Sequence, residues 1–398
     1  MLSARINGFS AERFEVGHVP GVKFDVTSAR PEAAREFRAI LRAACSVSHT
    51  FRAGVVAVGS MGELLPAALV LCGARGVSAV GELSLGGQVR PVRGAFVMGE
   101  ALAGLEVLCA RENAAEFAAA GARPVPVDSL GDALAVLRGE IDPVEWTPPE
   151  TGPAVVNGYT VDPTHIRGQW AALEAVATAI GRGRPVVLHG PPGCGKTLIG
   201  RCVNGILPEM ADGVRVEATR IHSVAGLGSG RSGLIDCRPF RAPHHTASLS
   251  AMVGGGVGRE ARPGEFSLSH GGVLFLDELP EFARHVLEAL PHILKAGKVS
   301  IARAGSVVEI PARPAAVVAT ANPCPCGYHG YPETGRACRC PALAVERYRA
   351  RWQVLAASLG AVVVQVPPVP AAALLRADSM VSAEQVERLR ALCAGVQS

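Results

Sequence analysis

The sequence predicts an α/β protein made of two α/β units, and three observations support this fold class. Short apolar runs bounded by glycines, such as "GVSAVGEL", alternate with segments of helical spacing, such as "EAAREFRAILRAAC". The apolar run "PVVL" leads into the glycine-rich stretch "GPPGCGKT" at 190–197 and then into a helix-like segment. Finally, "GGVLFLDELPEF" places four consecutive apolar residues before two acids, which is typical of a buried parallel strand.

The composition indicates a globular protein of ordinary solubility. The 398 residues are enough for two or three domains, and 48% of them are hydrophobic. We expect a cytoplasmic protein without a membrane partner, because no apolar run reaches the ~18 residues that span a bilayer and "MLSARINGFS" lacks a signal-peptide core. Eleven cysteines, an odd number, favour reduced thiols or metal ligands over a disulfide framework.

The elements follow in order along the chain. In the first unit, residues 1–140, "GVVAVGS", "GVSAVGEL" and "LEVLCA" predict strands, and "DALAVLRG" predicts a closing helix that ends at Gly139. Residues 141–160 are rich in proline and predict a linker. The second unit covers 161–366, and 367–398 predict a short, mostly helical C-terminal tail.

A phosphate-binding loop is predicted at the start of the second unit. The motif G-x-x-x-x-G-K-[ST] is matched by Gly190, Gly195, Lys196 and Thr197. Lys196 is expected to reach the β- and γ-phosphates of ATP, and the Thr197 hydroxyl to ligate Mg²⁺. The whole loop is the candidate nucleotide site: Gly190, Pro191, Pro192, Gly193, Cys194, Gly195, Lys196 and Thr197.

Two further strands are expected to complete a catalytic site. Asp277 and Glu278 follow the run "VLFL", so both carboxylates fall at the carboxyl edge of the sheet, where α/β proteins bind ligands. We expect Asp277 to hold Mg²⁺ and Glu278 to orient and polarise the attacking water. Asn322 follows "PAAVVATA" and is expected to bond the water or the γ-phosphate; the alternative is a simple turn residue. Together these residues predict the catalytic half of an AAA+ ATPase.

Two segments offer candidate contacts for DNA. In "KVSIARAGSVVEIPA", alternating runs flank Ala304-Gly305 and predict a hairpin with Arg303 near its tip, either as a polymer contact or as a solvated arginine. In "RPFRAPHHTAS", Arg238, Phe240 and Arg241 suit phosphate contact and base stacking, or else they stiffen a loop beside the nucleotide. The pair His244-His245 has no acidic or cysteine partner at ligand spacing in the sequence, which disfavours a metal role.

Four cysteines form a candidate zinc site. Cys324 and Cys326, and Cys338 and Cys340, are two C-x-C pairs that bracket a glycine-rich loop, and four thiolates can close tetrahedrally on Zn²⁺. The alternative is a set of reduced or redox-active thiols, and His329 could replace one cysteine.

The segments "RPFRAPHHTAS", "GGGVGREARPGEFSLSHGGVLFLDELPEF" and "ATANPCPCGYHG" resemble the magnesium-chelatase-like AAA+ proteins of the ComM/YifB group, over about residues 1–350. The resemblance implies a Lon-protease-like N-terminal domain over 1–140 and an AAA+ domain with a shortened helical lid. It also implies a homo-oligomeric ring, a hexamer, that is driven by ATP and acts on single-stranded or branched DNA. Members of this type are associated with branch migration and recombination during transformation.

The C-terminal part departs from that family. Ser358, Leu359 and Ala361 stand where the family pattern has Asp, Arg and Asp, so an arginine suited to acting on the γ-phosphate is replaced. Arg347, Arg349 or Arg351 could substitute for it. The departure keeps open a second hypothesis, a catalytically degenerate nucleotide-binding subunit that is regulatory or structural and co-assembles with an intact paralogue.

Two other functions are disfavoured. A chelatase subunit for metal insertion does not agree with the Lon-like domain or the cysteine loop. A Ser–Lys protease would need a lysine of lowered pKa near its nucleophile, but the candidate Ser60 has only the distant Lys23 available, because no lysine lies between Lys23 and Lys196.

Overall fold

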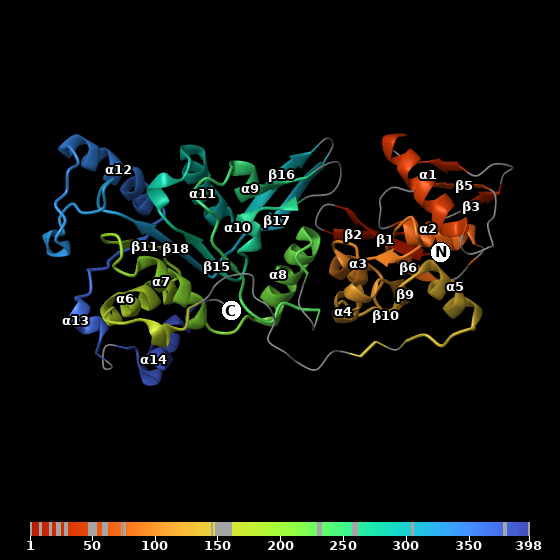
Figure 1. Ribbon diagram of the computed structural model, residues 1–398, viewed down its shortest axis with the longest axis horizontal. Helices are drawn as coiled ribbons and strands as arrows, with labels where there is room; N and C mark the ends of the chain where they lie inside the picture. The colour runs from red at the N-terminus through yellow and green to blue at the C-terminus, as the bar shows by residue number, and fades with distance from the viewer. Residues whose placement is uncertain are drawn as a thin grey trace. The chain divides into compact units, whose positions relative to one another are not determined.

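The computed structural model separates the chain into two compact units, each described here by itself (Figure 1). Unit 1 comprises Met1–Ala154, Thr219–Asp236 and Gly256–Arg262, and unit 2 comprises Val155–Ala218, Cys237–Gly255 and Pro263–Ser398. The described residues are 2–7, 10–15, 18–20, 25–27, 31–46, 54–57, 63–72, 74, 77–144, 146–147, 161–228, 233–256, 262–303, 306–376 and 380–396.

Unit 1 is an α/β unit, as its sequence predicts. Its central sheet has the order β10-β9-β6-β1-β2, in which only the β1–β2 pair is antiparallel. The sheet strands are β1 (Leu2–Asn7), β2 (Ser10–Glu15), β6 (Ser78–Val80), β9 (Glu106–Cys109) and β10 (Arg123–Pro126). Shorter strands are β3 (His18–Pro20), β4 (Asp25–Thr27), β5 (Gly54–Ala57), β7 (Glu82–Leu83) and β8 (Val89–Arg90).

The helices of unit 1 cover this sheet with apolar faces. They are α1 (Pro31–Ser46), α2 (Leu64–Leu71), α3 (Ala95–Ala101), η2 (Arg111–Asn113), α4 (Ala114–Ala119) and α5 (Leu130–Arg138). The predicted closing helix is confirmed as α5. Its first turn is capped because the Ser129 hydroxyl accepts the Asp132 N–H, and it ends where Gly139 adopts the left-handed conformation at φ 69°.

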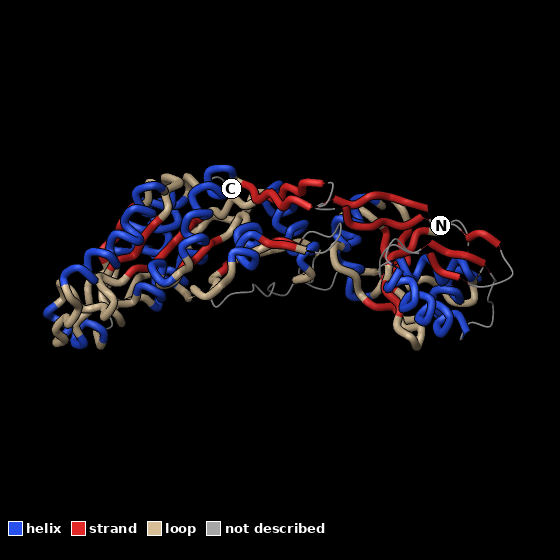
Figure 2. The backbone as a smooth tube through the Cα atoms, turned by 90° about the horizontal axis from the view of Figure 1, so that it is seen from above, coloured by secondary structure: helices blue, strands red, loops and turns tan. Residues whose placement is uncertain are grey.

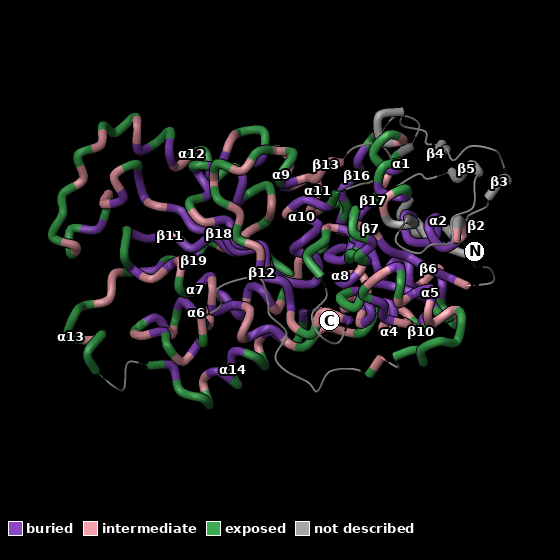
Figure 3. Tube along the Cα trace, turned by 45° about the vertical axis from the view of Figure 1, so that its right-hand side comes forward, coloured by how far each residue is buried: buried purple, intermediate pink, exposed green. Residues whose placement is uncertain are grey.

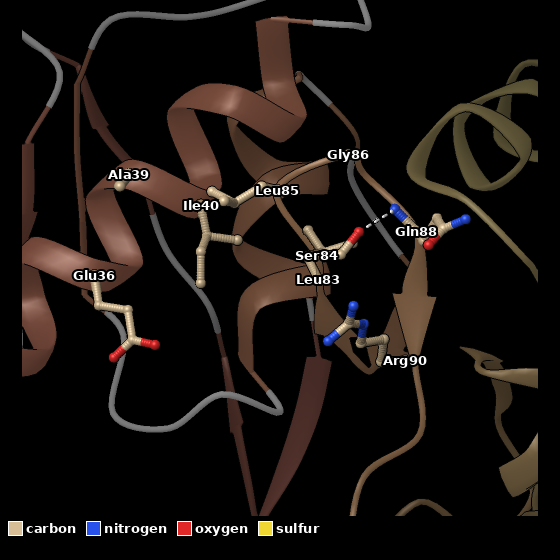
Figure 4. Close-up of a pocket in the computed structure, with 9 residues that line it drawn as sticks. All are labelled: Glu36, Ala39, Ile40, Leu83, Ser84, Leu85, Gly86, Gln88 and Arg90. Atoms are coloured by element: carbon tan, nitrogen blue, oxygen red, sulfur yellow. Dashed lines mark hydrogen bonds between the residues drawn. The ribbon is translucent and has the colours of Figure 1, made fainter.

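A cavity of about 780 Å³ opens in unit 1 beside α1 and the β7–β8 hairpin. Figure 4 shows Ile40 of α1 next to Leu85 of the hairpin, with Glu36 and Arg90 at the polar margin. The Gln88 N–H donates to the Ser84 hydroxyl at 3.0 Å and closes the hairpin turn. The cavity shares no residue with the phosphate loop.

Unit 2 contains a five-stranded parallel sheet. Its order is β12-β15-β18-β11-β19, which is 2-3-4-1-5 when the sheet strands are counted along the chain. The strands are β11 (Val186–His189), β12 (Phe240–Arg241), β15 (Val273–Leu276), β18 (Ala316–Ala321) and β19 (Val362–Gln365). All of β15 and β18 is buried, because helices cover both faces of a parallel sheet (Figure 3). This arrangement confirms the predicted AAA+ α/β/α fold.

Helices form a layer on either side of this sheet, as Figures 1 and 2 show. One layer holds α6 (Trp170–Gly181), α7 (Lys196–Cys202) and α14 (Ala383–Cys393), which share one core with β11, β15 and β18. The other helices of unit 2 are η3 (Pro163–His165), η4 (Val203–Gly205), α9 (Leu249–Val253), α10 (Glu265–Leu268), η5 (Leu279–Glu281), α11 (Arg284–Ala296), η6 (Pro332–Thr334), α12 (Ala342–Ser358) and α13 (Ala371–Leu374). The helix α8 (Asp212–Ala225) begins in unit 2, and its residues from Thr219 onward belong to unit 1. The short strands β13 (Gly254–Gly255) and β14 (Arg262–Pro263) complete the described elements.

The C-terminal tail contributes to the core of unit 2. Ser382 and Gln385 form a reciprocal capping box at the start of α14. From this helix Val386, Leu389 and Cys393 are buried in the same core as α6. Among the described residues, no helix is both long and apolar enough to cross a membrane.

Candidate active site

The phosphate loop joins β11 to α7 at the carboxyl edge of the sheet. Because β11 lies between β18 and β19, the loop opens where strand order changes direction, which is where such sheets bind ligands. Gly193 and Gly195 adopt left-handed conformations with φ of 77° and 97°, which glycine adopts without steric cost. A side chain at Gly190 would place its Cβ 2.2 Å from the Val366 carbonyl oxygen, so the loop requires glycine there too.

Lys196 is a buried cation that points back across this loop. Its side-chain nitrogen donates to the carbonyl oxygens of Gly190 and Pro191, both at 2.8 Å. Burial lowers the pKa of Lys196, and among the described residues no carboxylate forms a salt bridge with it. A buried ammonium with neutral hydrogen-bond partners is suited to receive an anion, so the site fits the phosphates of a nucleotide.

Cys194 fills space within the loop. The residue is 4% exposed, and burial raises the pKa of its thiol. Its sulfur lies 3.9 Å from the Lys196 nitrogen. A buried thiol of raised pKa is a poor nucleophile, so Cys194 serves the packing of the loop rather than chemistry.

Two hydroxyl groups connect Asp277 to strand β18 and to the phosphate loop. The Thr197 hydroxyl lies 3.1 Å from Asp277 Oδ2, and the Thr320 hydroxyl donates to Asp277 Oδ1 at 2.6 Å. A hydroxyl and a carboxylate side by side are the oxygen ligands that Mg²⁺ takes in nucleotide sites. The sequence prediction missed Thr320, whose only signal was a hydroxyl in the otherwise apolar strand "AVVATA".

Glu278 has an unusual backbone conformation. It is the one described non-glycine residue with a positive φ, at 55°, and its N–H donates to the Thr320 hydroxyl at 2.8 Å. Strained conformations of this kind persist where the surroundings enforce them, and they concentrate at functional sites. The Glu278 side chain is 51% exposed, so water can reach its carboxylate.

Asn322 comes directly after β18 at the same edge of the sheet. The last residue of β18, Ala321, pairs with His189, the last residue of β11. The Ala321 carbonyl also accepts the Gly190 N–H at 3.3 Å. Asn322 therefore lies beside the start of the phosphate loop, at the sheet edge where the sequence predicts it.

The comparison with family models agrees with this geometry. Residues 162–371, more than half of the chain, match the family described as magnesium chelatase, subunit ChlI. The chain belongs to this family. The matched residues contain the phosphate loop, Asp277, Glu278, Asn322 and the four-cysteine loop.

Individual relatives narrow the membership to the ComM/YifB-like branch. The chain is 38% identical over 258 residues to the competence protein ComM of Haemophilus influenzae, covering 63% of this chain and 49% of ComM. It is 37% identical over 253 residues to YifB of Escherichia coli, again covering 63% and 49%. An uncharacterized protein of Mycobacterium tuberculosis is 40% identical over 280 residues, covering 68% and 52%. The chain spans about half the length of these curated relatives.

The segment that departs from the ComM/YifB pattern forms the end of α12 and the turn into β19. Leu359 terminates α12, so no guanidinium is available at that position. Of the three arginines proposed to compensate, Arg349 donates from Nε to the Pro323 carbonyl at 3.1 Å, next to Asn322. Arg347 and Arg351 are exposed on the same helix.

One predicted DNA contact is wrong. Arg238 is 5% exposed, and its guanidinium donates to the carbonyl oxygens of Pro208, Glu209 and Gly271. Phe240 is 3% exposed and stacks on Phe275 inside the core. Buried side chains cannot contact phosphates or bases, so the structural alternative holds for this pair.

Arg241 is engaged in a similar way. Its guanidinium makes two hydrogen bonds of 2.6 Å to the Glu265 carboxylate, and both side chains are largely buried. This bidentate pair fixes the chain just after β12.

The predicted hairpin is confirmed as β16 (Lys298–Arg303) paired antiparallel with β17 (Ser306–Pro311). Its tip, Ala304-Gly305, and the side chain of Arg303 lie outside the described residues. Ser60 and Lys23, which the protease hypothesis requires, also lie outside them.

The four cysteines of the loop 324–340 come together. The Cys324 sulfur lies 3.3 Å from that of Cys326 and 3.7 Å from that of Cys338, and all four sulfurs lie within 4.8 Å of one another. Hydrogen bonding from the Tyr328 N–H lowers the pKa of Cys326 to about 6. Among the described residues this group contains Cys340 as its fourth member and does not include His329.

Proposed function

We propose that this chain binds ATP with Mg²⁺ and hydrolyses it, as a cytoplasmic motor subunit that assembles into a homo-oligomeric ring and acts on DNA. The observation that carries the proposal is the convergence of Lys196, Thr197, Asp277 and Glu278 at one edge of the sheet. Thr320 joins Asp277 to Glu278 by hydrogen bonds, and the Thr197 hydroxyl bonds to Asp277. Membership of the ComM/YifB-like branch supports it.

Each residue has a distinct part in the proposed reaction. Lys196 and the loop N–H groups hold the phosphates of ATP, and Thr197 and Asp277 would hold Mg²⁺, which screens the phosphate charge when bound. Glu278 accepts a proton from water as the water oxygen bonds to the γ-phosphorus. The bond from the γ-phosphorus to the bridging oxygen breaks, and ADP and phosphate leave. Asn322 orients the water.

The DNA part of the proposal rests on the resemblance and on one structural element. The hairpin β16–β17 forms a separate two-stranded sheet, with Val299, Ile301 and Ile310 buried, and a two-stranded ribbon is a form suited to contacting a polymer. One of the relatives is named for competence. On the resemblance to the ComM/YifB group, we propose single-stranded or branched DNA as the substrate and a hexameric ring that drives branch migration and recombination during transformation.

The replacement of the family arginine by Leu359 supports a second candidate. In that case the chain binds nucleotide as a regulatory or structural subunit and depends on an intact paralogue for turnover. Arginines that stabilise the transferring phosphoryl group contribute ~10³–10⁵ in rate in GTPases, so their loss can abolish turnover without affecting binding.

Steady-state ATP turnover by the purified chain distinguishes the two candidates. We expect turnover that single-stranded or four-way branched DNA stimulates, and none with Lys196→Ala, which serves as the blank. Tight ATP binding without turnover under every condition would contradict the motor proposal and support the regulatory subunit.

We also propose that the four-cysteine loop holds one structural Zn²⁺. Tetrahedral Zn–S bonds of ~2.3 Å require sulfurs about 3.8 Å apart. The sulfurs of Cys324, Cys326 and Cys338 lie 3.3–3.7 Å apart, too far for a disulfide bond, and all four sulfurs lie within 4.8 Å of one another. Mass spectrometry of the purified chain should find about one zinc per chain. Cys338→Ser should lose the metal, whereas Cys237→Ser, outside the group, should retain it. A metal-free wild-type chain purified without chelator would refute this site.

A further inference from the structure

His245 lies beside the proposed water-activating carboxylate, although 33 residues separate the two in the sequence. Its Nδ1 is 3.6 Å from Glu278 Oε2. The register of the sheet explains this approach. Phe240 pairs with Val273 and Arg241 with Leu274, so the segments after β12 and β15 leave the sheet at the same edge.

The segment that carries His245 is fixed at both ends. On one side, the bidentate Arg241–Glu265 pair holds the end of β12. On the other side, the Ser248 hydroxyl accepts the Ala251 N–H at 3.1 Å and caps α9. Because only a few residues connect these two anchors, the backbone at His245 has little freedom to move away from Glu278.

The imidazole of His245 is also held from its other side. The ring of His244 lies against it, with centroids 4.1 Å apart and planes at 33°. His244 is itself fixed because its Nδ1 lies 2.8 Å from the Thr246 hydroxyl and accepts the Thr246 N–H at 3.3 Å. The stack orients His245 so that its Nδ1 faces Glu278.

Glu278 needs such a neighbour to keep one orientation. Its N–H is already committed to the Thr320 hydroxyl, and its side chain is half exposed. Within the described part of the chain, His245 is the one basic side chain with a nitrogen within 4.0 Å of this carboxylate. The 3.6 Å separation is longer than a hydrogen bond, as is common for catalytic contacts that tighten when substrate binds.

We propose that His245 is a positioning residue for Glu278, which keeps the carboxylate aligned on the attacking water. The proposal rests on the proposed ATP hydrolysis. Small errors in the placement of a catalytic group lower the rate of the chemical step without lowering substrate affinity. His245 should therefore affect kcat and leave KM unchanged.

The kinetic test compares three variants. His245→Ala should lower kcat about tenfold, with KM and ATP affinity within about twofold of wild type. His245→Asn, whose amide nitrogen lies near the position of Nδ1, should recover kcat to within about threefold of wild type. His292→Ala, on the exposed face of α11, is the matched control and should have no effect. An unchanged or raised kcat in His245→Ala, or a change confined to KM, would overturn the proposal.

A second readout does not depend on turnover. In the chain labelled with ¹⁵N-histidine, Glu278→Gln should shift the His245 ring resonances, because it removes the facing charge. Glu288→Gln, which alters an exposed pair with Arg284 on α11, is the control and should leave them in place. If the wild type does not hydrolyse ATP but Glu278→Gln shifts the His245 signal, the proposed function is contradicted and the contact between His245 and Glu278 is supported. If the signal does not move, the positioning role is overturned whatever the turnover.

Discussion

Thr320 connects the two acidic residues of the candidate site. A single hydroxyl donates to the Asp277 carboxylate at 2.6 Å and accepts the Glu278 N–H at 2.8 Å. The residue is 1% exposed, so both bonds are shielded from water. At the scale of single residues, this hydroxyl explains how Glu278 is held in a left-handed conformation while Asp277 faces Thr197.

Thr320→Val tests the contribution of this hydroxyl, because valine keeps the shape of the threonine side chain but has no hydroxyl. The variant removes the acceptor of the Glu278 N–H and leaves Asp277 Oδ1 with only the longer contact to the Thr197 hydroxyl at 3.4 Å, which costs about 1–3 kcal/mol of unfolding free energy. ATP turnover should fall by about ten- to a hundredfold. Denaturant unfolding and steady-state turnover measure the two effects.

Thr320→Ser is the matched control for that prediction. It keeps the hydroxyl and loses one methyl group, so turnover should remain within a few-fold of wild type. Equal losses of turnover in the Val and Ser variants would contradict the role assigned to the hydroxyl.

At the scale of elements, the cysteine loop follows directly after the end of β18 and packs against the phosphate loop. Cys324 follows Asn322 by two residues and is fully buried. Gly327, at φ 86°, lies so close to the phosphate loop that an added Cβ would fall 2.5 Å from Pro192 Cγ. We therefore expect a chelator that removes the proposed zinc to lower both the thermal stability and the ATP affinity of the chain, as thermal unfolding and an ATP-binding titration would measure.

His189, the last residue of β11, should make stability depend on pH. Its ring packs between Tyr331 and Trp352, with centroids 6.4 Å and 5.3 Å away. Burial lowers the pKa of His189 to about 4, and the neighbouring cations Arg349 and Lys196 act in the same direction. Below pH ~6.5 the unfolded chain binds a proton at His189 that the folded chain excludes. The free energy of unfolding is therefore highest above pH ~6.5 with respect to this residue, and it decreases as the pH falls toward 4.

His189→Phe tests this pH dependence. It keeps an aromatic ring and removes the proton-binding nitrogen, so the stability of the variant relative to wild type should rise by about 1 kcal/mol between pH 7.5 and pH 5. Thermal unfolding at the two values measures the change. A difference that is the same at both values would show that His189 does not titrate on unfolding.

At the scale of the whole molecule, the fold class, several strands of the second unit and the main motifs were predictable from the sequence, whereas the order of the strands in each sheet comes from the structure. Continuous apolar runs identified β11, β15 and β18, and the spacing of Gly190, Lys196 and Thr197 identified the phosphate loop. These signals are local, because they depend on neighbouring residues in one strand or one loop.

The rest depended on contacts that no local pattern contains. Arg238 resembles a nucleic-acid contact in the sequence, and only the fold reveals the three carbonyl oxygens that its guanidinium satisfies. Thr320 is a β-branched residue with ordinary strand propensity, which hides its polar role. His245 meets Glu278 only because β12 and β15 are neighbours in the sheet.

We propose that Lys196 and Glu278 have separate roles, in which Lys196 binds the nucleotide and Glu278 activates water. ATP binding and ATP turnover measured on the same preparations of wild type, Lys196→Ala and Glu278→Gln test it most directly. We predict that Glu278→Gln binds ATP as tightly as wild type but does not hydrolyse it, while Lys196→Ala loses both. Wild-type turnover in Glu278→Gln, or unchanged ATP affinity in Lys196→Ala, would contradict the account.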